Sequence, residues 1–169
     1  MGDAEQDAER ERTVRAGSLL VATPGMTDPN FADTVVLMLD VRQRRGVRGT
    51  EYAWANSLRL QSALAEAQIG YRHHRELAPT TELRLLQYAD DHRQGVGKRN
   101  RRRLAADYTR RYTTEILDHA DLVSLVSALP SRGLAALLCV ERDWEACHRS
   151  LIAGRLADRH DIAVGHLRP

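Results

Sequence analysis

Two short apolar segments constrain the fold of this chain more than any other feature. They are TVVLMLDV at 34–41 and GLAALLCV at 133–140, and both are apolar almost throughout. A strand with one face in water alternates between apolar and polar residues, whereas a strand covered on both faces does not. The pattern therefore predicts two buried strands of a mainly parallel sheet flanked by helices.

The rest of the chain supplies the other elements of such a fold. Further strands are expected at 17–26, 71–77 and 161–167. Helical spacing occurs at 52–68, 80–94, 98–129 and 144–160, where 98–129 is expected to form one long helix or two consecutive ones. Alternation of strands and helices predicts a single α/β domain. Residues 1–15 are charged, with almost no aliphatic side chains, and are predicted to be disordered.

Composition limits the cellular setting and the partners. The 169 residues, 43% of them hydrophobic, suffice for one core, and the net charge is only +2. No apolar run is long enough for a membrane span, and the first residues lack the apolar core of a secretory signal. Two cysteines cannot form a disulfide framework, so a reduced, cytoplasmic location is expected. The sequence does not indicate an oligomeric state.

Reactive side chains gather where the two buried strands end. Cys139 and Glu141 lie at the end of one strand, with Cys147, His148 and Arg149 shortly after. Asp143 is a candidate cap that would place these three in the first two turns of the next helix. The other strand ends at Asp40, followed by Arg42 and Arg48. Ligands bind outside the carboxyl ends of parallel strands, so the two ends are expected to form one pocket.

The expected chemistry of this pocket is anion binding with proton transfer. Arg42, Arg48 and Arg149 would hold a phosphate-bearing small molecule or nucleotide, since arginine binds such groups through paired hydrogen bonds. Glu141 or His148 would move protons, and Cys139 or Cys147 would shape the site. Further expected pocket residues are Asp40, Tyr71 and His73. The alternative is that both cysteines are ordinary core residues. No cofactor is indicated.

Other types of site fit the sequence less well. Cys139, Cys147 and His148 lack the spacing of a zinc finger or zinc ribbon. Adjacent residues on a helix point about 100° apart, so Cys147 and His148 are not expected to reach one metal ion. A phosphatase-like loop, with an arginine six residues after the cysteine, is missing, and GVGK at 95–98 fails the phosphate-loop pattern.

A basic segment offers an alternative function. GVGKRNRRR at 95–103 contains five basic residues and no acidic one. Together with Arg110 and Arg111 they would form a nucleic-acid-binding surface, although such runs are more often solvated loops. The five residues are Lys98, Arg99, Arg101, Arg102 and Arg103.

Several blocks in order resemble the DUF488 family of uncharacterised bacterial proteins. They are DVR, RGTEYAWANSLRLQSAL, IGYRHHRELAPTTELR, QGVGKRNRR, DYTRRY and LLCVERDWEACHRSLIA. The resemblance covers about 36–169 and implies an α/β domain. It also strengthens the site hypothesis, because the last block carries both cysteines, Glu141, His148 and Arg149. The family implies no assignable activity.

The preceding segment is similar to a different family. RAGSLLVATPGMTDPNFADTVVLMLD, within 15–40, resembles the start of the AlgH (UPF0301) family, another small bacterial α/β group. The expected domain organisation is therefore a tail at 1–15, an AlgH-like strand segment at 16–40 and a DUF488-like domain at 36–169. Such a fusion that folds but has no activity is a third functional hypothesis.

Overall fold

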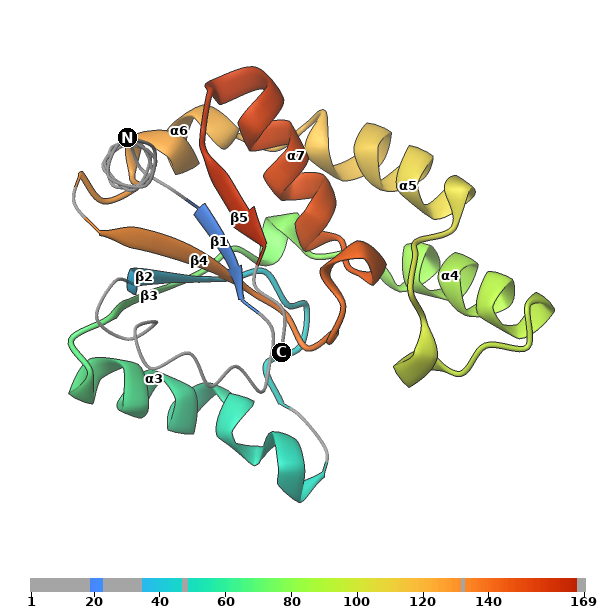
Figure 1. Cartoon of the computed structure of the whole chain (residues 1–169), viewed down its shortest axis with the longest axis horizontal. Coiled ribbons are helices and arrows are strands. Elements are labelled where there is room, and N and C mark those ends of the chain that lie inside the picture. The colour runs from blue at the N-terminus through green and yellow to red at the C-terminus, as the bar shows by residue number, and fades with distance from the viewer. Residues whose placement is uncertain (1–18, 23–34, 47–48, 132, 167–169) are drawn as a thin grey trace, which may run out of the picture.

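The computed structural model describes residues 19–22, 35–46, 49–131 and 133–166 of the chain (Figure 1). Its centre is a five-stranded sheet with the order β3-β2-β4-β1-β5, in which every pair of neighbours is parallel. The strands are β1 (Leu19–Ala22), β2 (Val35–Asp40), β3 (Gly70–His73), β4 (Leu134–Leu138) and β5 (Val164–His166). The predicted α/β class with a parallel sheet is confirmed.

Helices cover both faces of the sheet. One face carries α3, and the other carries α4 to α7 (Figure 1). The helices are α3 (Ser57–Glu66), α4 (Thr81–Arg93), α5 (Ala106–Tyr112), α6 (Leu122–Ser127) and α7 (Arg149–His160). A π-helical segment, Thr113–Leu117, continues α5, and short 3₁₀ turns occupy Thr50–Ala55, Arg75–Leu77, Lys98–Asn100 and Trp144–Ala146.

The two apolar runs form neighbouring strands at the middle of the sheet. All five residues of β4 are buried, because α3 packs against one side and the larger helical layer against the other. Leu60 and Leu64 of α3 face Met38 and Ala136, whereas Ile152 and Leu156 of α7 belong to the core on the opposite face. This two-sided burial explains why the runs do not alternate.

Three predicted helices begin later than expected, the first being α3, which begins at Ser57 rather than at 52. Residues 98–105 are not α-helical: Lys98–Asn100 is one 3₁₀ turn, Arg101 is extended, and α5 begins at Ala106. Arg101 is buried against Asp91 of α4, and this tertiary contact replaces the exposed helical turn that the composition favours. Similarly, α7 begins at Arg149 rather than at 144.

The structure describes only part of the N-terminal segment, so it tests only some of the predictions made for it. The strand expected in 17–26 is present as β1, between β4 and β5. The predicted tail at 1–15 and most of the AlgH-like segment at 16–40 lie outside the described residues. Among the helices that are described, none combines the length and apolar character needed to cross a membrane.

Candidate functional site

A cavity of about 240 Å³ lies at the carboxyl ends of β2 and β4. Its wall combines thiols, an imidazole and a carboxylate with several cationic and aromatic side chains. The main polar and aromatic lining residues are Arg42, Arg44, Arg84, Gln87, Tyr88, Lys98, Arg101, Tyr108, Cys139, Glu141, Cys147 and His148. The cavity therefore lies where parallel α/β sheets place their ligands.

The pairing of β2 with β4 brings the two strand ends together. Asp40 is in register with Leu138, and the amide of Val41 donates to the carbonyl of Leu138 at 3.2 Å. The chain segments that follow, with Arg42 on one side and Cys139 on the other, consequently leave the sheet side by side and line the same cavity.

Arg42 is held in a buried ion pair with Asp40. Its Nε donates to Asp40 Oδ1 at 2.8 Å, its Nη2 to Oδ2 at 2.7 Å, and its Nη1 to the Ala55 carbonyl at 2.7 Å. Burial alone would raise the pKa of Asp40, but hydrogen bonds from Arg42 and Tyr71 and the charge of Arg42 lower it below the ordinary value. Each guanidinium nitrogen thus has a protein acceptor, and the charge of Arg42 is already balanced.

Three expected pocket residues do not line the cavity: Asp40 belongs to this ion pair, and Tyr71 and His73 support it. Asp40 itself is fully buried. Tyr71 donates its hydroxyl to Asp40 Oδ2 at 2.7 Å, and His73 Nε2 lies 2.8 Å from the carbonyl oxygen of Arg42. These side chains reinforce the end of β2 and are not among the lining residues of the cavity.

Cys147 and His148 precede α7 and are not part of its first turns. Cys147 is extended, with φ −130° and ψ 143°, and His148 occupies the N-cap position. The expected capping by Asp143 is wrong: this residue begins the 3₁₀ turn at 144–146, and its carboxylate accepts from Arg142 Nε instead of capping the helix. The 3₁₀ turn moves the start of α7 five residues along the chain.

This backbone arrangement brings the imidazole to the thiol. Cys147 Sγ lies 3.7 Å from His148 Nδ1, so the argument that adjacent side chains diverge by 100° is wrong for this pair. That argument holds within a helix, whereas Cys147 is extended. The ligand atoms of Cys139, Cys147 and His148 all lie within 4.8 Å of one another, and all three residues are buried.

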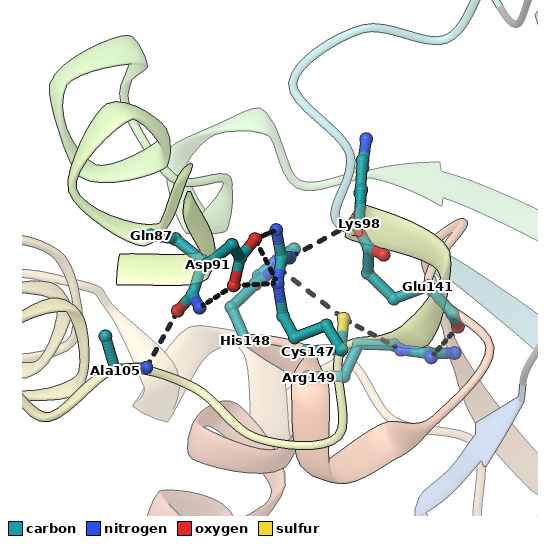
Figure 2. Close-up of polar contacts among 9 residues, drawn as sticks. Gln87, Asp91, Lys98, Ala105, Glu141, Cys147, His148 and Arg149 are labelled. Carbon is teal, nitrogen blue, oxygen red and sulfur yellow. Dashed lines mark hydrogen bonds and ion pairs between the residues drawn. The ribbon is translucent and has the colours of Figure 1, made fainter. Parts of the chain in front are cut away.

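Arg149 balances the charge of this thiol group. Its Nε donates to Cys147 Sγ at 3.2 Å and its Nη2 to the carbonyl of Glu141 at 2.7 Å (Figure 2). Burial raises the pKa of the Cys147 thiol, but a hydrogen bond from Cys139, the positive charge of Arg149 and the neighbouring imidazole of His148 lower it well below the ordinary value. The hydrogen bond to Cys147, with burial, raises the pKa of Cys139.

Arg149 does not line the cavity as an anion-binding residue would. The side chain is fully buried and contacts the cluster from behind. Its Nη1 has no hydrogen-bond partner among the residues that the structure describes. The third arginine expected to bind anions, Arg48, lies outside those residues.

Glu141 faces cationic side chains across the cavity. Its Oε1 is 3.9 Å from both Lys98 Nζ and Arg101 Nη1 (Figure 2). Burial raises the pKa of Glu141, as does the charge of Cys147, and the charges of Lys98 and Arg101 offset part of this rise. The carboxyl group is therefore more readily protonated than an exposed glutamate, which suits proton transfer near neutral pH.

A buried polar network fixes Arg101 at the cavity wall. Asp91 accepts from Arg101 Nε at 2.9 Å and also pairs with Arg101 Nη2. Gln87 donates to Asp91 at 2.8 Å and accepts from the amide of Ala105 at 2.8 Å (Figure 2). Because every member has a partner, the network holds the 98–105 segment against α4.

The basic segment is therefore divided between two environments. Lys98 and Arg101 line the cavity. Lys98 Nζ lies 5.9 Å and Arg101 Cζ lies 5.8 Å from the ring centre of Tyr88. Arg102 and Arg103 are exposed, as is Arg110. Arg111 is half-buried and pairs with Glu115.

The family assignment follows from a comparison with protein-family models. Residues 26–156 match DUF488, a domain of unknown function. The chain belongs to the DUF488 family. No curated protein matches the chain, and no solved structure does.

The DUF488 match covers the whole candidate site and more of the N-terminal side than expected. It begins at residue 26, ten residues before the predicted boundary at 36, and so includes part of the segment that resembles AlgH. The AlgH-like origin of 16–40 stays a prediction.

Five of the main polar and aromatic lining residues of this DUF488 domain were not identified from the sequence: Arg44, Arg84, Gln87, Tyr88 and Tyr108. Arg84 and Tyr88 are one helical turn apart on α4, and Tyr108 is on α5. Arg84 and Tyr108 fall within blocks quoted above for the family, and that position was the one signal available to find them.

Proposed function

We propose that this protein is an enzyme that binds a small anionic molecule, such as a nucleotide or another phosphate ester, in the cavity at the ends of β2 and β4. One observation carries the proposal: the cavity places unbalanced cationic side chains opposite a carboxyl group, two thiols and an imidazole. Pockets that combine charged binding groups with groups able to transfer protons are typical of active sites.

The cationic groups available to an anion differ from Arg42 and Arg149, the two arginines expected from the sequence that the structure describes. Arg42 is balanced by Asp40 and Arg101 by Asp91. Arg44 and Arg84 line the cavity without an ion pair among the described residues, and Lys98 shares Glu141 with Arg101. Arg84 is half-buried, and its Nε lacks a hydrogen-bond partner among the described residues. These three side chains supply the positive charge for an anion.

Glu141 is the proton-transfer residue in this proposal. Its carboxyl group lines the cavity and is 22% exposed, so a bound molecule can reach it. Lys98 and Arg101 lie at equal distances from Oε1 and orient the group. Cys139, Cys147 and His148 form the buried wall beside it.

Binding is tested with inorganic phosphate, nucleotides, sugar phosphates and dicarboxylates by thermal shift, followed by calorimetry. A ligand that binds only the folded protein raises Tm. Arg84→Ala and Lys98→Ala are each expected to weaken binding by about 10- to 100-fold, since a hydrogen bond to a charged group contributes about 1.5–3 kcal/mol. Arg59→Ala is the matched control, because Arg59 is exposed on α3, on the opposite face of the sheet from α4. Equal affinities in all three variants contradict the proposal.

Turnover is tested with Glu141→Gln on any compound that the wild type converts. Loss of general acid–base catalysis lowers kcat by about 10²–10⁴-fold while the binding constant changes little. An inactive fusion predicts that no compound in the set is bound or converted.

Nucleic-acid binding through 98–103 stays a prediction. It requires affinity that falls steeply with salt and with removal of Arg102 and Arg103, which are exposed and do not line the cavity. The placement of Lys98 and Arg101 in the cavity supports the small-molecule hypothesis instead.

A further inference from the structure

The buried wall of the cavity contains three soft metal ligands close together. We propose that Cys139, Cys147 and His148 bind a zinc ion through two sulfur atoms and one imidazole nitrogen, with a fourth coordination position open to the cavity. This site goes beyond the proposed function, because zinc binding can be measured without any substrate.

The distances fit three corners of a tetrahedron. Zinc bonds of about 2.3 Å to sulfur and about 2.0–2.1 Å to nitrogen imply separations of about 3.5–3.8 Å between ligand atoms in tetrahedral geometry. Cys147 Sγ and His148 Nδ1 are 3.7 Å apart, and all three ligand atoms lie within 4.8 Å of one another. Bringing the more distant atoms to tetrahedral spacing requires a shift of at most about 1.3 Å.

The hydrogen bonds of His148 select the tautomer that a metal needs. Nε2 lies 3.0 Å from the carbonyl oxygen of Val41, which can only accept, so Nε2 carries the hydrogen. In the neutral ring this leaves the lone pair of Nδ1 directed at the thiols. A backbone carbonyl that orients a histidine in this way is common behind zinc ligands.

Arg149 supports the thiolate that zinc requires. Its Nε donates to Cys147 Sγ at 3.2 Å, and its Nη2 is anchored on the carbonyl of Glu141 at 2.7 Å. Two thiolates and a zinc ion are neutral together, so the charge of Arg149 remains and gives the site a positive field. An anionic ligand in the cavity would complete the charge balance.

The open position indicates a reactive rather than a purely structural site. Structural zinc sites have four protein ligands, whereas catalytic sites have three and leave one position for water or substrate. Among the residues that the structure describes, no fourth histidine, cysteine or carboxylate joins the group. All three proposed ligands line the cavity together with Glu141. Two thiolates and one imidazole favour zinc over calcium or magnesium, which prefer oxygen.

The site is tested on the full chain without a histidine tag, reduced and dialysed against a chelator. Zinc added alone is titrated against a chromogenic competitor, and we expect one ion per chain with Kd below about 1 µM. Cobalt in place of zinc should give intense visible bands of tetrahedral geometry and a thiolate-to-cobalt charge-transfer band. Weaker binding, or a cobalt spectrum without the charge-transfer band, overturns the proposal.

Variants and thiol protection identify the ligands. Cys139→Ser, Cys147→Ser and His148→Gln should each weaken zinc binding by about 100-fold or more, because loss of even a supporting residue costs about 10–100-fold. His119→Ala, at an exposed histidine, is the control and should bind zinc as the wild type does.

A second measurement uses the wild type, so it tests the proposal even if the variants fail to fold. In the wild type, zinc should slow alkylation of both cysteines by at least tenfold, and a chelator should restore the original rate. Equal alkylation rates with and without zinc overturn the proposal, as does undiminished zinc affinity in either folded serine variant.

Discussion

Two buried arginines, one shortly after β2 and one at the start of α7, are balanced in different ways. Arg42, after β2, has a protein acceptor for each guanidinium nitrogen and a carboxylate as its counterion. Arg149, beyond β4, contacts the thiol of Cys147 and one carbonyl, and its Nη1 has no partner within the described residues. The first arrangement is complete within the protein, whereas the second leaves one guanidinium nitrogen without an acceptor and has a thiol in place of a carboxylate.

The difference lies in how each counterion responds when its arginine is removed. An unpaired buried carboxylate must be protonated far above its ordinary pKa or remain charged in an apolar site, and both are costly. A thiol is protonated at neutral pH without its partner, at little cost. A carboxylate therefore makes the Arg42 site rigid and structural. The thiol at the Arg149 site can change its charge state as metal or substrate binds.

The largest expected effect is on the Arg42 site. Asp40→Asn leaves the buried charge of Arg42 without a counterion and should lower the free energy of unfolding by about 3–5 kcal/mol. Chemical denaturation monitored by circular dichroism measures the loss. Asp107→Asn is the control, because Asp107 forms an exposed ion pair with Arg110 and should leave stability nearly unchanged. A small effect for Asp40→Asn would remove the distinction between the two arginines.

The same ion pair predicts how stability depends on pH. The pKa of Asp40 is lower in the folded protein than its ordinary value of 3.8, so the unfolded chain binds the proton first as pH falls. The stabilisation is fully present above about pH 4 and is lost as pH falls through the folded-state pKa. The stability difference between wild type and Asp40→Asn should therefore be constant from pH 8 to about pH 5 and shrink below pH 4. A difference independent of pH would show that charge is not its origin.

A smaller loss of stability is expected at the Arg149 site. Arg149→Gln removes the hydrogen bonds to Cys147 and Glu141 and some packing, but the thiol can be protonated, so the loss should be about 1–2 kcal/mol. Zinc affinity should fall by about 10–100-fold, as for other residues that support metal ligands. Denaturation and competitive zinc titration measure the two effects. A stability loss equal to that of Asp40→Asn would mean that both sites are structural.

The sequence predicts the location of the cavity because strand burial is visible locally. The runs before Asp40 and Cys139 are apolar throughout, and this pattern is sufficient to indicate adjacent buried strands whose ends share one edge. The α/β fold follows from the same pattern. The ion pair of Arg42 with Asp40 was not predicted, although the two residues are only two positions apart, because the pattern favours anion binding by Arg42.

The remaining features depend on contacts between distant segments. The pairing of Arg101 with Asp91 converts an apparently helical and solvated segment into a cavity wall, and composition alone does not indicate this. Likewise, the 3₁₀ turn at 144–146 delays α7 and brings the side chain of His148 to that of Cys147. Helix propensity at 144–160 favours the opposite result, because local preferences are overridden where tertiary contacts are formed.

The smallest expected effect is that of Tyr71→Phe. It tests whether Asp40 is kept in its charged form mainly by its ion pair with Arg42. Tyr71→Phe removes the hydroxyl that donates to Asp40 Oδ2 at 2.7 Å, while both hydrogen bonds from the Arg42 side chain to Asp40 remain. The free energy of unfolding should fall by about 1 kcal/mol, the usual contribution of one hydrogen bond. Tyr88→Phe, at a partly exposed ring, is the matched control and should have a negligible effect. If Tyr71→Phe cost as much as Asp40→Asn, the hydroxyl and not the guanidinium would hold the carboxylate in its charged form, and Arg42 would be free to bind anions after all.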